Sequence, residues 1–401
     1  MNRLTTSWGE FGLTRFPDQP RETLRAWDSA DEYLLEHLAG EGDTDTVPTD
    51  LSGTVVVVGD RWGALTTALA AHRLDQLSAG PLVQITDSYL TQQSTRANLR
   101  RSGAAADAVR LLSARDTPPE RIDVLLIRVP KSLAFLEDQL HRLAPAVHQD
   151  TVVVATGRVT EIHTSTLKLF EQILGPTRTS LAVRKARLVF CSPAADRPRT
   201  ASPWPHRYAL PEGLGAVSGR TVVNHAGIFC AERLDIGTRF FLRNLPRRTG
   251  PEHVVDLGCG NGVVGTAVAL ANPEARVTFI DESFSAVASA EATFRENTRT
   301  DAAGTPAAPA AFVLGDGMAG VPAGTVDLVL NNPPFHSHQA TTDAAAWRMF
   351  TGAKAALRPG GELWVVGNRH LGYHAKLRRL FGNCEVVTSD PKFVVLRTVK
   401  N

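Results

Sequence analysis

The chain has 401 residues, 43% of them hydrophobic, which is enough apolar material for two packed domains rather than one. A formal net charge of +2 excludes a chain-wide polyanion-binding surface, so contact with nucleic acid must use a local basic patch. Four widely separated cysteines without a CxxC pair argue against a zinc site or disulfides, and no apolar run could span a membrane. These features predict a soluble, cytoplasmic protein, which we expect to be a monomer.

The first half of the chain alternates between short apolar runs and helical patterns. Apolar positions within 24–35 are compatible with an amphipathic helix, and an alanine-rich helix is expected at 64–74. Apolar, β-branched runs bounded by turn residues predict strands. The predicted strands are 54–58, 82–86, 124–127 and 151–155. Strands that alternate with helices in this way predict a doubly wound parallel sheet.

A proline-rich segment separates the two halves of the chain. Residues 192–218 contain five prolines and few apolar pairs, which is typical of a linker between domains. We therefore predict a first domain at 1–191 and a second at 219–401.

The order of elements in the first half recurs after residue 250, from which we infer the duplication of one α/β unit. The matching segments are 254–258 with 56–59, Asp281 with Asp87, 327–330 with 123–126, and 362–366 with 151–155. The copies differ where chemistry would occur. The first copy has 127–131 in place of 331–335, and its glycine loop contains the bulky Arg61 and Trp62. We therefore predict that the N-terminal copy is degenerate and serves stability or RNA docking.

A glycine loop follows the first strand of the second copy, with the sequence Asp256-Leu257-Gly258-Cys259-Gly260-Asn261-Gly262. Glycines let a ligand approach the backbone, although a tight strand–helix turn needs them as well. The acidic Asp256 disfavours a dinucleotide pyrophosphate and favours a cation. S-adenosyl-L-methionine carries two cationic groups and no phosphate, so it is the predicted cofactor.

Two further acidic residues follow the next two strands of this copy. Asp281 is suited to accept hydrogen bonds from ribose hydroxyls, and Asp316 from an adenine amine, although either could cap a helix or a turn. A phosphate-binding P-loop is disfavoured because no Gly-Lys-Ser/Thr follows the glycines. The predicted cofactor-binding residues are Asp256, Gly258, Gly260, Asn261, Gly262, Asp281, Asp316 and Asn331, and no metal is predicted.

The predicted catalytic turn is Asn331-Asn332-Pro333-Pro334-Phe335-His336, directly after the apolar run 326–330. Two prolines end a strand because they cannot donate to the sheet. The Asn332 side-chain oxygen and the Pro333 carbonyl can accept hydrogen bonds from a planar exocyclic amine, and Phe335 can stack on the base. The alternative is a simple turn, and His336 could contact the substrate or merely pack. The predicted catalytic residues are Asn332, Pro333, Pro334 and Phe335.

At these residues the chain resembles the class I S-adenosylmethionine-dependent methyltransferases that carry an Asn-Pro-Pro-aromatic motif. The chain resembles the bacterial ribosomal RNA guanine-N2 methyltransferases in its duplicated architecture and in segments 234–238 and 256–265. Its C-terminal tail, at 367–377 and 392–396, resembles that of the large-subunit type. The resemblance implies an α/β fold of two tandem Rossmann-like class I methyltransferase domains, the N-terminal one degenerate. It also implies guanine-N2 methylation in 23S rRNA with S-adenosyl-L-methionine. The alanine- and proline-rich insertion at 298–311 makes the spacing to Asp316 unusual for this family.

Several alternatives follow from the same residues. The substrate could be 16S rRNA, or the turn could hold an adenine amine in DNA or a glutamine amide in a protein. The chain could also be an RNA-binding ribosome-assembly protein with a residual cofactor fold. If guanine N2 is the target, we expect an unpaired or flipped-out base, because a paired base cannot reach a buried methyl donor. Candidate RNA-docking residues in the first domain are Arg61, Arg96, Arg100, Arg101, Arg184, Lys185 and Arg187.

Overall fold

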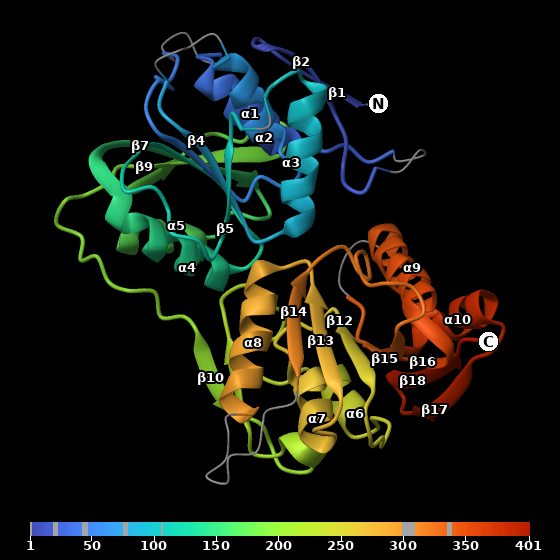
Figure 1. Ribbon diagram of the computed structural model, residues 1–401. Coiled ribbons are helices and arrows are strands. Elements are labelled where there is room, and N and C mark those ends of the chain that lie inside the picture. Colours follow the sequence, from blue (N-terminus) through green and yellow to red (C-terminus); the bar gives the residue numbers. More distant parts are fainter. Residues whose placement is uncertain are drawn as a thin grey trace. The chain divides into compact units, whose positions relative to one another are not determined.

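The computed structural model describes residues 2–18, 23–41, 47–74, 79–105, 107–298, 309–334 and 339–401. The chain divides into two compact units, Met1–Pro203 and Trp204–Asn401 (Figure 1). Each unit has its own sheet and its own pair of apolar cores, so each is described by itself.

The N-terminal unit is built on a mixed sheet of seven strands among its described residues, in the order β5-β4-β3-β6-β7-β9-β8. The first five run parallel, whereas β9 is antiparallel to both β7 and β8. Its strands are β3 (Val55–Val58), β4 (Leu82–Thr86), β5 (Arg110–Ser113), β6 (Ile122–Arg128), β7 (Val147–Arg158), β8 (Thr177–Thr179) and β9 (Ala186–Cys191), beside a hairpin of β1 (Asn2–Thr6) and β2 (Gly9–Leu13). Its helices are α1 (Ser29–Leu38), α2 (Ala64–His72), α3 (Tyr89–Arg101), α4 (Leu133–Leu143), α5 (Thr164–Ile173) and the short η1 (Ala144–Ala146).

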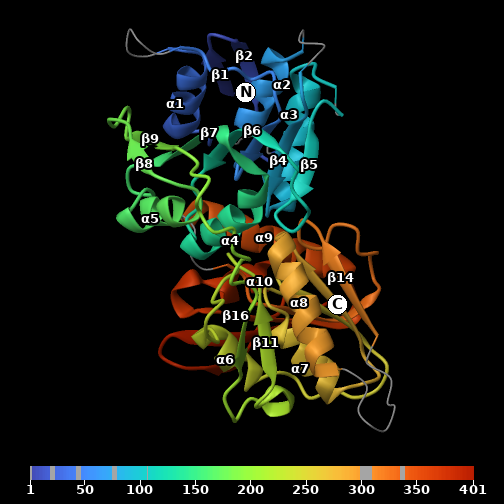
Figure 2. The ribbon, with the colours of Figure 1, turned by 90° about the vertical axis from the view of Figure 1, so that its left-hand side faces the viewer.

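Strand β3 explains the two-sided packing of this sheet. All four of its valines are buried, as a central parallel strand requires. Successive side chains alternate, so Val55 and Val57 join the core that includes α1, α2 and α3, while Val56 and Val58 join the core with α4 and α5. Figure 2 shows these two groups of helices beside the sheet.

The first helix begins later than the sequence predicted. Asp28 caps α1 by accepting a hydrogen bond from Ala30 N at 2.9 Å, while the Asp31 side chain accepts one from Asp28 N at 2.8 Å. This reciprocal capping box starts the helix at Ser29 rather than at residue 24.

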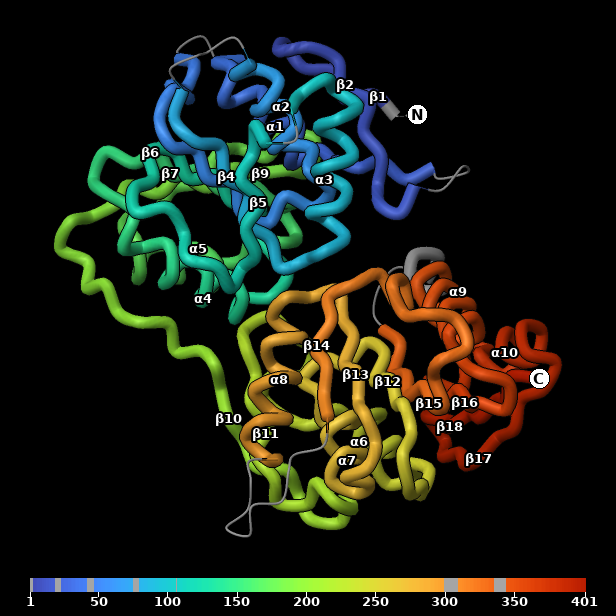
Figure 3. Tube along the Cα trace, in the orientation of Figure 1, coloured from blue at the N-terminus to red at the C-terminus, as the bar shows by residue number. Residues whose placement is uncertain are grey.

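The C-terminal unit repeats this topology, with the strand order β14-β13-β12-β15-β16-β18-β17 among its described residues. Its strands are β12 (His253–Leu257), β13 (Arg276–Asp281), β14 (Ala310–Leu314), β15 (Val326–Asn331), β16 (Leu357–Asn368), β17 (Glu385–Ser389) and β18 (Phe393–Val399). Its helices are α6 (Ile236–Leu242), α7 (Val263–Ala271), α8 (Phe284–Thr298), α9 (Gln339–Ala356), α10 (Tyr373–Phe381) and the short η2 (Gly215–Val217) and η3 (Arg369–Leu371). The path can be followed in Figure 3. The predicted α/β fold with two Rossmann-like domains is confirmed.

The faces of this second sheet carry different helices. Val254 of β12 packs in the core beneath α6, α7 and α8, whereas Val255 and Leu257 pack in the core with α9 and α10. Because side chains alternate along a strand, this register also decides which way the residues at the strand ends point.

The segment predicted to be a linker, 192–218, contributes in part to the second unit. Strand β10 (His206–Ala209) pairs antiparallel with β11 (Thr221–Asn224), and Val223 N donates to Thr293 Oγ1 of α8 at 3.0 Å. The prolines do not prevent this pairing, because the four residues of β10 contain none.

The described part of the chain lacks membrane-spanning helices, metal-binding clusters and disulfides. No helix in the described part of the chain is long and apolar enough to cross a membrane. Within the described ranges, no group of three or more His, Cys, Asp or Glu side chains is placed to hold a metal ion. All four cysteines lie in described segments, and all are free thiols.

Candidate active site

The predicted site residues that the structure describes all lie in the C-terminal unit. Asp316 follows β14, and the others lie at the carboxyl ends of β12, β13 and β15. Strand β12 ends at Leu257, β13 at Asp281 and β15 at Asn331. Because β12 lies between the other two and all three are parallel, the three ends meet at one edge of the sheet. This is where open α/β sheets bind their ligands.

The glycine loop joins β12 to α7 in a conformation that favours glycine. Gly258, Gly260 and Gly262 have φ of 71°, 52° and 73°, in the left-handed region. Gly258 N donates to Ile280 O at 2.8 Å, which holds the loop against β13. A Cβ at Gly260 would have no described atom within 4 Å, so the loop is open on that side.

Asp281 supports the loop through its carboxylate. One oxygen accepts from Gly260 N and the other from Ser283 N, both at 3.0 Å. Burial raises the pKa of Asp281, and these backbone N–H groups partly oppose the increase. Its predicted role toward the cofactor ribose stays a prediction, and the observed contact is with the loop that would hold the cofactor.

Asp256 lies beneath the loop rather than on its open side. It points to the same face of β12 as Val254, is 3% exposed, and accepts a hydrogen bond from Gly265 N in the first turn of α7 at 2.8 Å. Burial raises its pKa to about 7. Asp256 therefore anchors α7 to β12, and its predicted contact with the cofactor stays a prediction.

Two other predicted cofactor residues have protein partners. Asp316 Oδ1 lies 3.5 Å from Nε of Arg348 on α9, so its charge is compensated. Asn261 donates from Nδ2 to Oδ1 of the buried Asn224 at the end of β11, at 3.1 Å. Strand β11 thus supports the glycine loop, which is a contact the sequence alone did not indicate.

The end of β15 presents two asparagines to opposite faces of the sheet. Asn331 is fully buried and points toward α9, where its Nδ2 donates to Leu257 O at 2.7 Å and lies 3.8 Å from Met349 Sδ. Its Oδ1 is shielded from solvent and accepts no hydrogen bond from any described residue. Asn331 therefore ties β15 to β12 at the start of the glycine loop.

Asn332 points to the other face, toward the start of α6. Its Nδ2 donates to Thr238 Oγ1 at 3.0 Å, and its shielded Oδ1 has no hydrogen-bond partner among the described residues. Pro333 is buried and Pro334 is exposed, while Phe335 and His336 lie outside the described residues. The predicted stacking role of Phe335 therefore stays a prediction.

The described residues fit S-adenosyl-L-methionine. The loop is open at Gly260, and the buried Oδ1 of Asn331 accepts from no donor among the described residues. Buried acceptors without partners are costly, so a ligand that brings N–H or O–H groups would stabilise this site. The ammonium, the ribose hydroxyls and the adenine amine of this cofactor are such groups.

Comparison with known proteins agrees with this geometry. The family model described as RLMG N-terminal domain matches residues 1–195, and that of the Methyltransferase small domain matches residues 219–397. The chain is 69% identical to the Ribosomal RNA large subunit methyltransferase G of Streptomyces avermitilis, over 99% of both chains. It belongs to the ribosomal RNA large subunit methyltransferase G family. The family predicted from the sequence is thereby confirmed.

More distant members of the methyltransferase G family also match over the full length. The Pseudomonas aeruginosa protein of that name is 46% identical over 100% of both chains. Among solved structures, the T. Thermophilus 16S rRNA N2 methyltransferase RsmC, in complex with AdoMet and guanosine, matches with a TM-score of 0.73 and 18% identity. That match covers 100% of this chain and 98% of the other and concerns the fold.

In this protein the N-terminal copy of the site is filled by an ion-pair network. Strand pairing places Ile127 at the position of Asn331, and hence Arg128 at that of Asn332. The Arg128 side chain is 1% exposed and lies 2.9 Å from carboxylate oxygens of both Asp28 and Glu161, and 3.3 Å from one of Asp31. These charges pair with one another, so the position of Asn332 carries a donor-only guanidinium in this copy instead of an amide oxygen.

The N-terminal copy was predicted to be degenerate because its loop contains Arg61 and Trp62. In the structure a third residue, Arg128, lies at the centre of the altered site. Arg61 does stand in the degenerate loop, and its guanidinium pairs with Glu161 at 2.6 Å and with Asp28 at 3.2 Å. The central charge is nevertheless Arg128, which the sequence analysis did not single out. The signal was present, because an arginine at the end of a strand as apolar as 122–127 must be paired when buried.

The network predicts a pH-dependent stability of the N-terminal unit. Although burial opposes it, the charges of Arg128 and Arg61 lower the pKa of Glu161 to about 2, from 4.5. The stability that this carboxylate contributes, about 3 kcal/mol, is present above pH 4.5 and is lost as the pH falls toward 2. Glu161→Gln should therefore lower the free energy of unfolding at pH 7 but flatten its decrease below pH 4.5. Hydrogen exchange of the N-terminal unit, followed by mass spectrometry across this pH range, measures the effect, with the exposed Glu120→Gln as control. Stability curves in which both variants followed the wild type would contradict the prediction.

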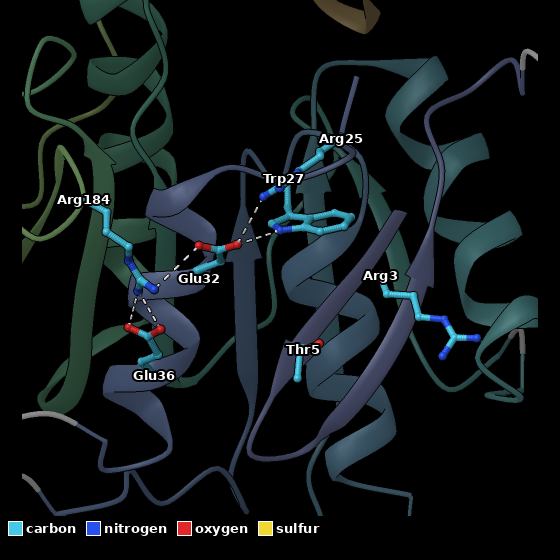
Figure 4. A pocket seen from close by; sticks show the side chains of 7 residues that line it. All are labelled: Arg3, Thr5, Arg25, Trp27, Glu32, Glu36 and Arg184. Carbon is cyan, nitrogen blue, oxygen red and sulfur yellow. Dashed lines mark hydrogen bonds and ion pairs between the residues drawn. The ribbon is translucent and has the colours of Figure 1, made fainter. Parts of the chain in front are cut away.

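A cavity of about 430 Å³ in the N-terminal unit is lined by both arginine and glutamate side chains (Figure 4). Glu32 accepts from Trp27 Nε1 at 2.9 Å and lies 4.0 Å from Arg25, while Glu36 accepts from Arg184 at 2.6 Å. No predicted catalytic or cofactor-binding residue lines the cavity. The two glutamates in its lining already pair with two of its arginines, Arg25 and Arg184. It is therefore not a candidate active site.

Proposed function

We propose that this protein transfers a methyl group from S-adenosyl-L-methionine to the exocyclic N2 of a guanosine in 23S rRNA. The observation that carries the proposal is the unpartnered, solvent-shielded Oδ1 of Asn332 at a strand end beside the glycine loop. Membership of the methyltransferase G family supports the same assignment.

The cofactor is proposed to lie across the ends of β12 and β13. When bound, its sulfonium supplies an electrophilic methyl group. Asp281 holds the glycine loop and accepts from the ribose, while the open side of Gly260 lets the ligand reach the backbone. Asn331 offers its buried Oδ1 as a further acceptor.

Two glycines of the loop should respond differently to an added methyl group. Both have positive φ, so the backbone strain of alanine is shared, but a Cβ at Gly262 would lie 2.7 Å from Cα of Ala290, whereas one at Gly260 would meet no described atom. Gly262→Ala should therefore cost about 1–3 kcal/mol more stability than Gly260→Ala. Gly260→Ala should mainly weaken cofactor binding, about tenfold. Thermal melting and calorimetry measure the two effects, and an unchanged cofactor affinity in Gly260→Ala would place the ligand elsewhere.

The acceptor amine is proposed to sit between Asn332 and the prolines. The nitrogen lone pair of guanine N2 is delocalised into the ring, so the amine is a weak nucleophile. Acceptors at Asn332 Oδ1 and at the Pro333 carbonyl hold its two hydrogens and place the lone pair in line with the methyl group. The proton can leave after transfer, so no side chain is assigned as a general base.

The target guanosine is proposed to be unpaired or flipped out of a helix. Asn332 Oδ1 is shielded from solvent, so an amine must leave a base-paired stack to approach it. The N-terminal unit is proposed to contribute stability and RNA docking. Of the candidate docking residues, Arg100 and Lys185 are exposed and carry no ion pair with a described residue, whereas Arg61 and Arg184 are paired with glutamates.

Methylation of isolated RNA tests the proposal. The protein is incubated with labelled S-adenosyl-L-methionine and protein-free 23S rRNA, 16S rRNA or assembled large subunits, and the RNA is digested to nucleosides. We expect label in N2-methylguanosine from 23S rRNA. Label in 16S rRNA alone, in adenosine, or in no RNA would overturn the assignment.

A further inference from the structure

We propose that Thr238, supported by Asp235, is a positioning residue that fixes the Asn332 amide with its oxygen toward the acceptor amine. The proposal rests on the proposed function, since it concerns how Asn332 is oriented for that reaction. It starts from a chain of hydrogen bonds: Asn332 Nδ2 donates to Thr238 Oγ1 at 3.0 Å, and Thr238 Oγ1 donates to Asp235 Oδ2 at 3.2 Å.

The chemistry of the three groups gives this chain one direction. A carboxylate accepts hydrogen bonds, and a hydroxyl can donate only one. The Thr238 hydroxyl therefore spends its one donated hydrogen bond on Asp235. The hydroxyl then faces Asn332 with lone pairs alone, and only the NH₂ end of the amide can bond to it. Oδ1 of Asn332 is thereby turned away from Thr238, and it accepts no hydrogen bond from the described residues.

The frame that holds Thr238 is rigid. Asp235 is the N-cap of α6. Its Oδ2, which accepts the hydrogen bond from the Thr238 hydroxyl, also accepts one from Thr238 N at 2.8 Å. Helix α6 packs on β16 and β18, and a Cβ at Gly237 would lie 3.0 Å from the Phe393 ring. Thr238 therefore cannot follow Asn332 if the amide rotates.

The N-terminal copy uses the same three positions in another way. Its helix α1 has Asp28 as N-cap and Asp31 three residues later, matching Asp235 and Thr238, and Arg128 matches Asn332. There a donor-only guanidinium meets two carboxylates, so the residue at the Asn332 position has no acceptor atom to offer a substrate. The three positions are thus coupled in both copies, and only the C-terminal set places an amide oxygen at the end of its strand.

Loss of the Thr238 hydroxyl should affect turnover more than binding. Without a fixed partner the amide can turn its NH₂ toward the acceptor amine, where two donors face each other. We expect Thr238→Val, which keeps the shape of the side chain, to lower kcat on 23S rRNA about 10- to 100-fold. Cofactor Kd should change less than about twofold, and Thr238→Ser should restore kcat to within about threefold of the wild type.

The test measures kcat, KM for RNA and cofactor Kd for Thr238→Val, Thr238→Ser, Asn332→Ala and the double variant Thr238→Val/Asn332→Ala. If Thr238 acts through Asn332, the double variant should be no slower than Asn332→Ala. Unchanged kcat in Thr238→Val, or equal losses in the serine and valine variants, would overturn this inference while leaving the proposed function intact. Unchanged kcat in Asn332→Ala would instead overturn the proposed function.

Discussion

Replacing Asn332 by alanine is expected to lower kcat for rRNA methylation by about 10²- to 10³-fold while leaving cofactor affinity nearly unchanged. The Asn332 oxygen is shielded from solvent, so no water molecule can take its place as acceptor without rearrangement. Among the described residues the amide makes one hydrogen bond, to Thr238, so its removal should not unfold the unit. The loss should therefore appear in the chemical step.

Turnover with labelled cofactor and calorimetric titration of S-adenosyl-L-methionine measure the two quantities separately. Asn244→Ala is a matched control, because Asn244 lies just beyond the opposite end of α6 and its side-chain amide donates to Phe240 O, away from the site. We expect the control to retain wild-type kcat. An equal loss of cofactor affinity and kcat in Asn332→Ala would place Asn332 on the cofactor rather than on the base.

Replacing Arg128 by alanine is expected to destabilise the N-terminal unit by about 3–5 kcal/mol. The substitution leaves Asp28, Asp31 and Glu161 close together without the buried charge that compensates them. Arg128→Met should be nearly as destabilising, since a methionine restores volume but no charge. Cofactor affinity should be unaffected, because the cofactor is proposed to bind in the other unit.

Hydrogen exchange followed by mass spectrometry measures this loss in each unit separately, which global unfolding of a two-unit chain would not. Arg3→Ala is the control, because Arg3 is 72% exposed in its pair with Glu10, and such surface pairs contribute about 0–1 kcal/mol. A loss below about 1 kcal/mol in Arg128→Ala would mean that the three carboxylates are neutral or hydrated.

The predictions that held were those with local causes. The run of valines at 55–58 predicted a central buried strand, and the glycine loop and the strand before Asn332 lie where their residue types required. The start of α1 was missed although Asp28 and Asp31 form a capping box in the sequence. The direction of Asp256 could also have been inferred, since alternation places it on the face of Val254 and therefore beneath α7.

Residue types and their order were sufficient to determine the duplicated α/β architecture, the glycine loop after β12 and the turn after β15, because prolines, glycines and β-branched runs act on their own neighbourhood. The tertiary structure alone decided what holds the reactive groups. Thr238 meets Asn332 across 94 residues, and Asp28 meets Arg128 across 100. Such contacts depend on how strands pair and helices dock, and no local pattern encodes that register.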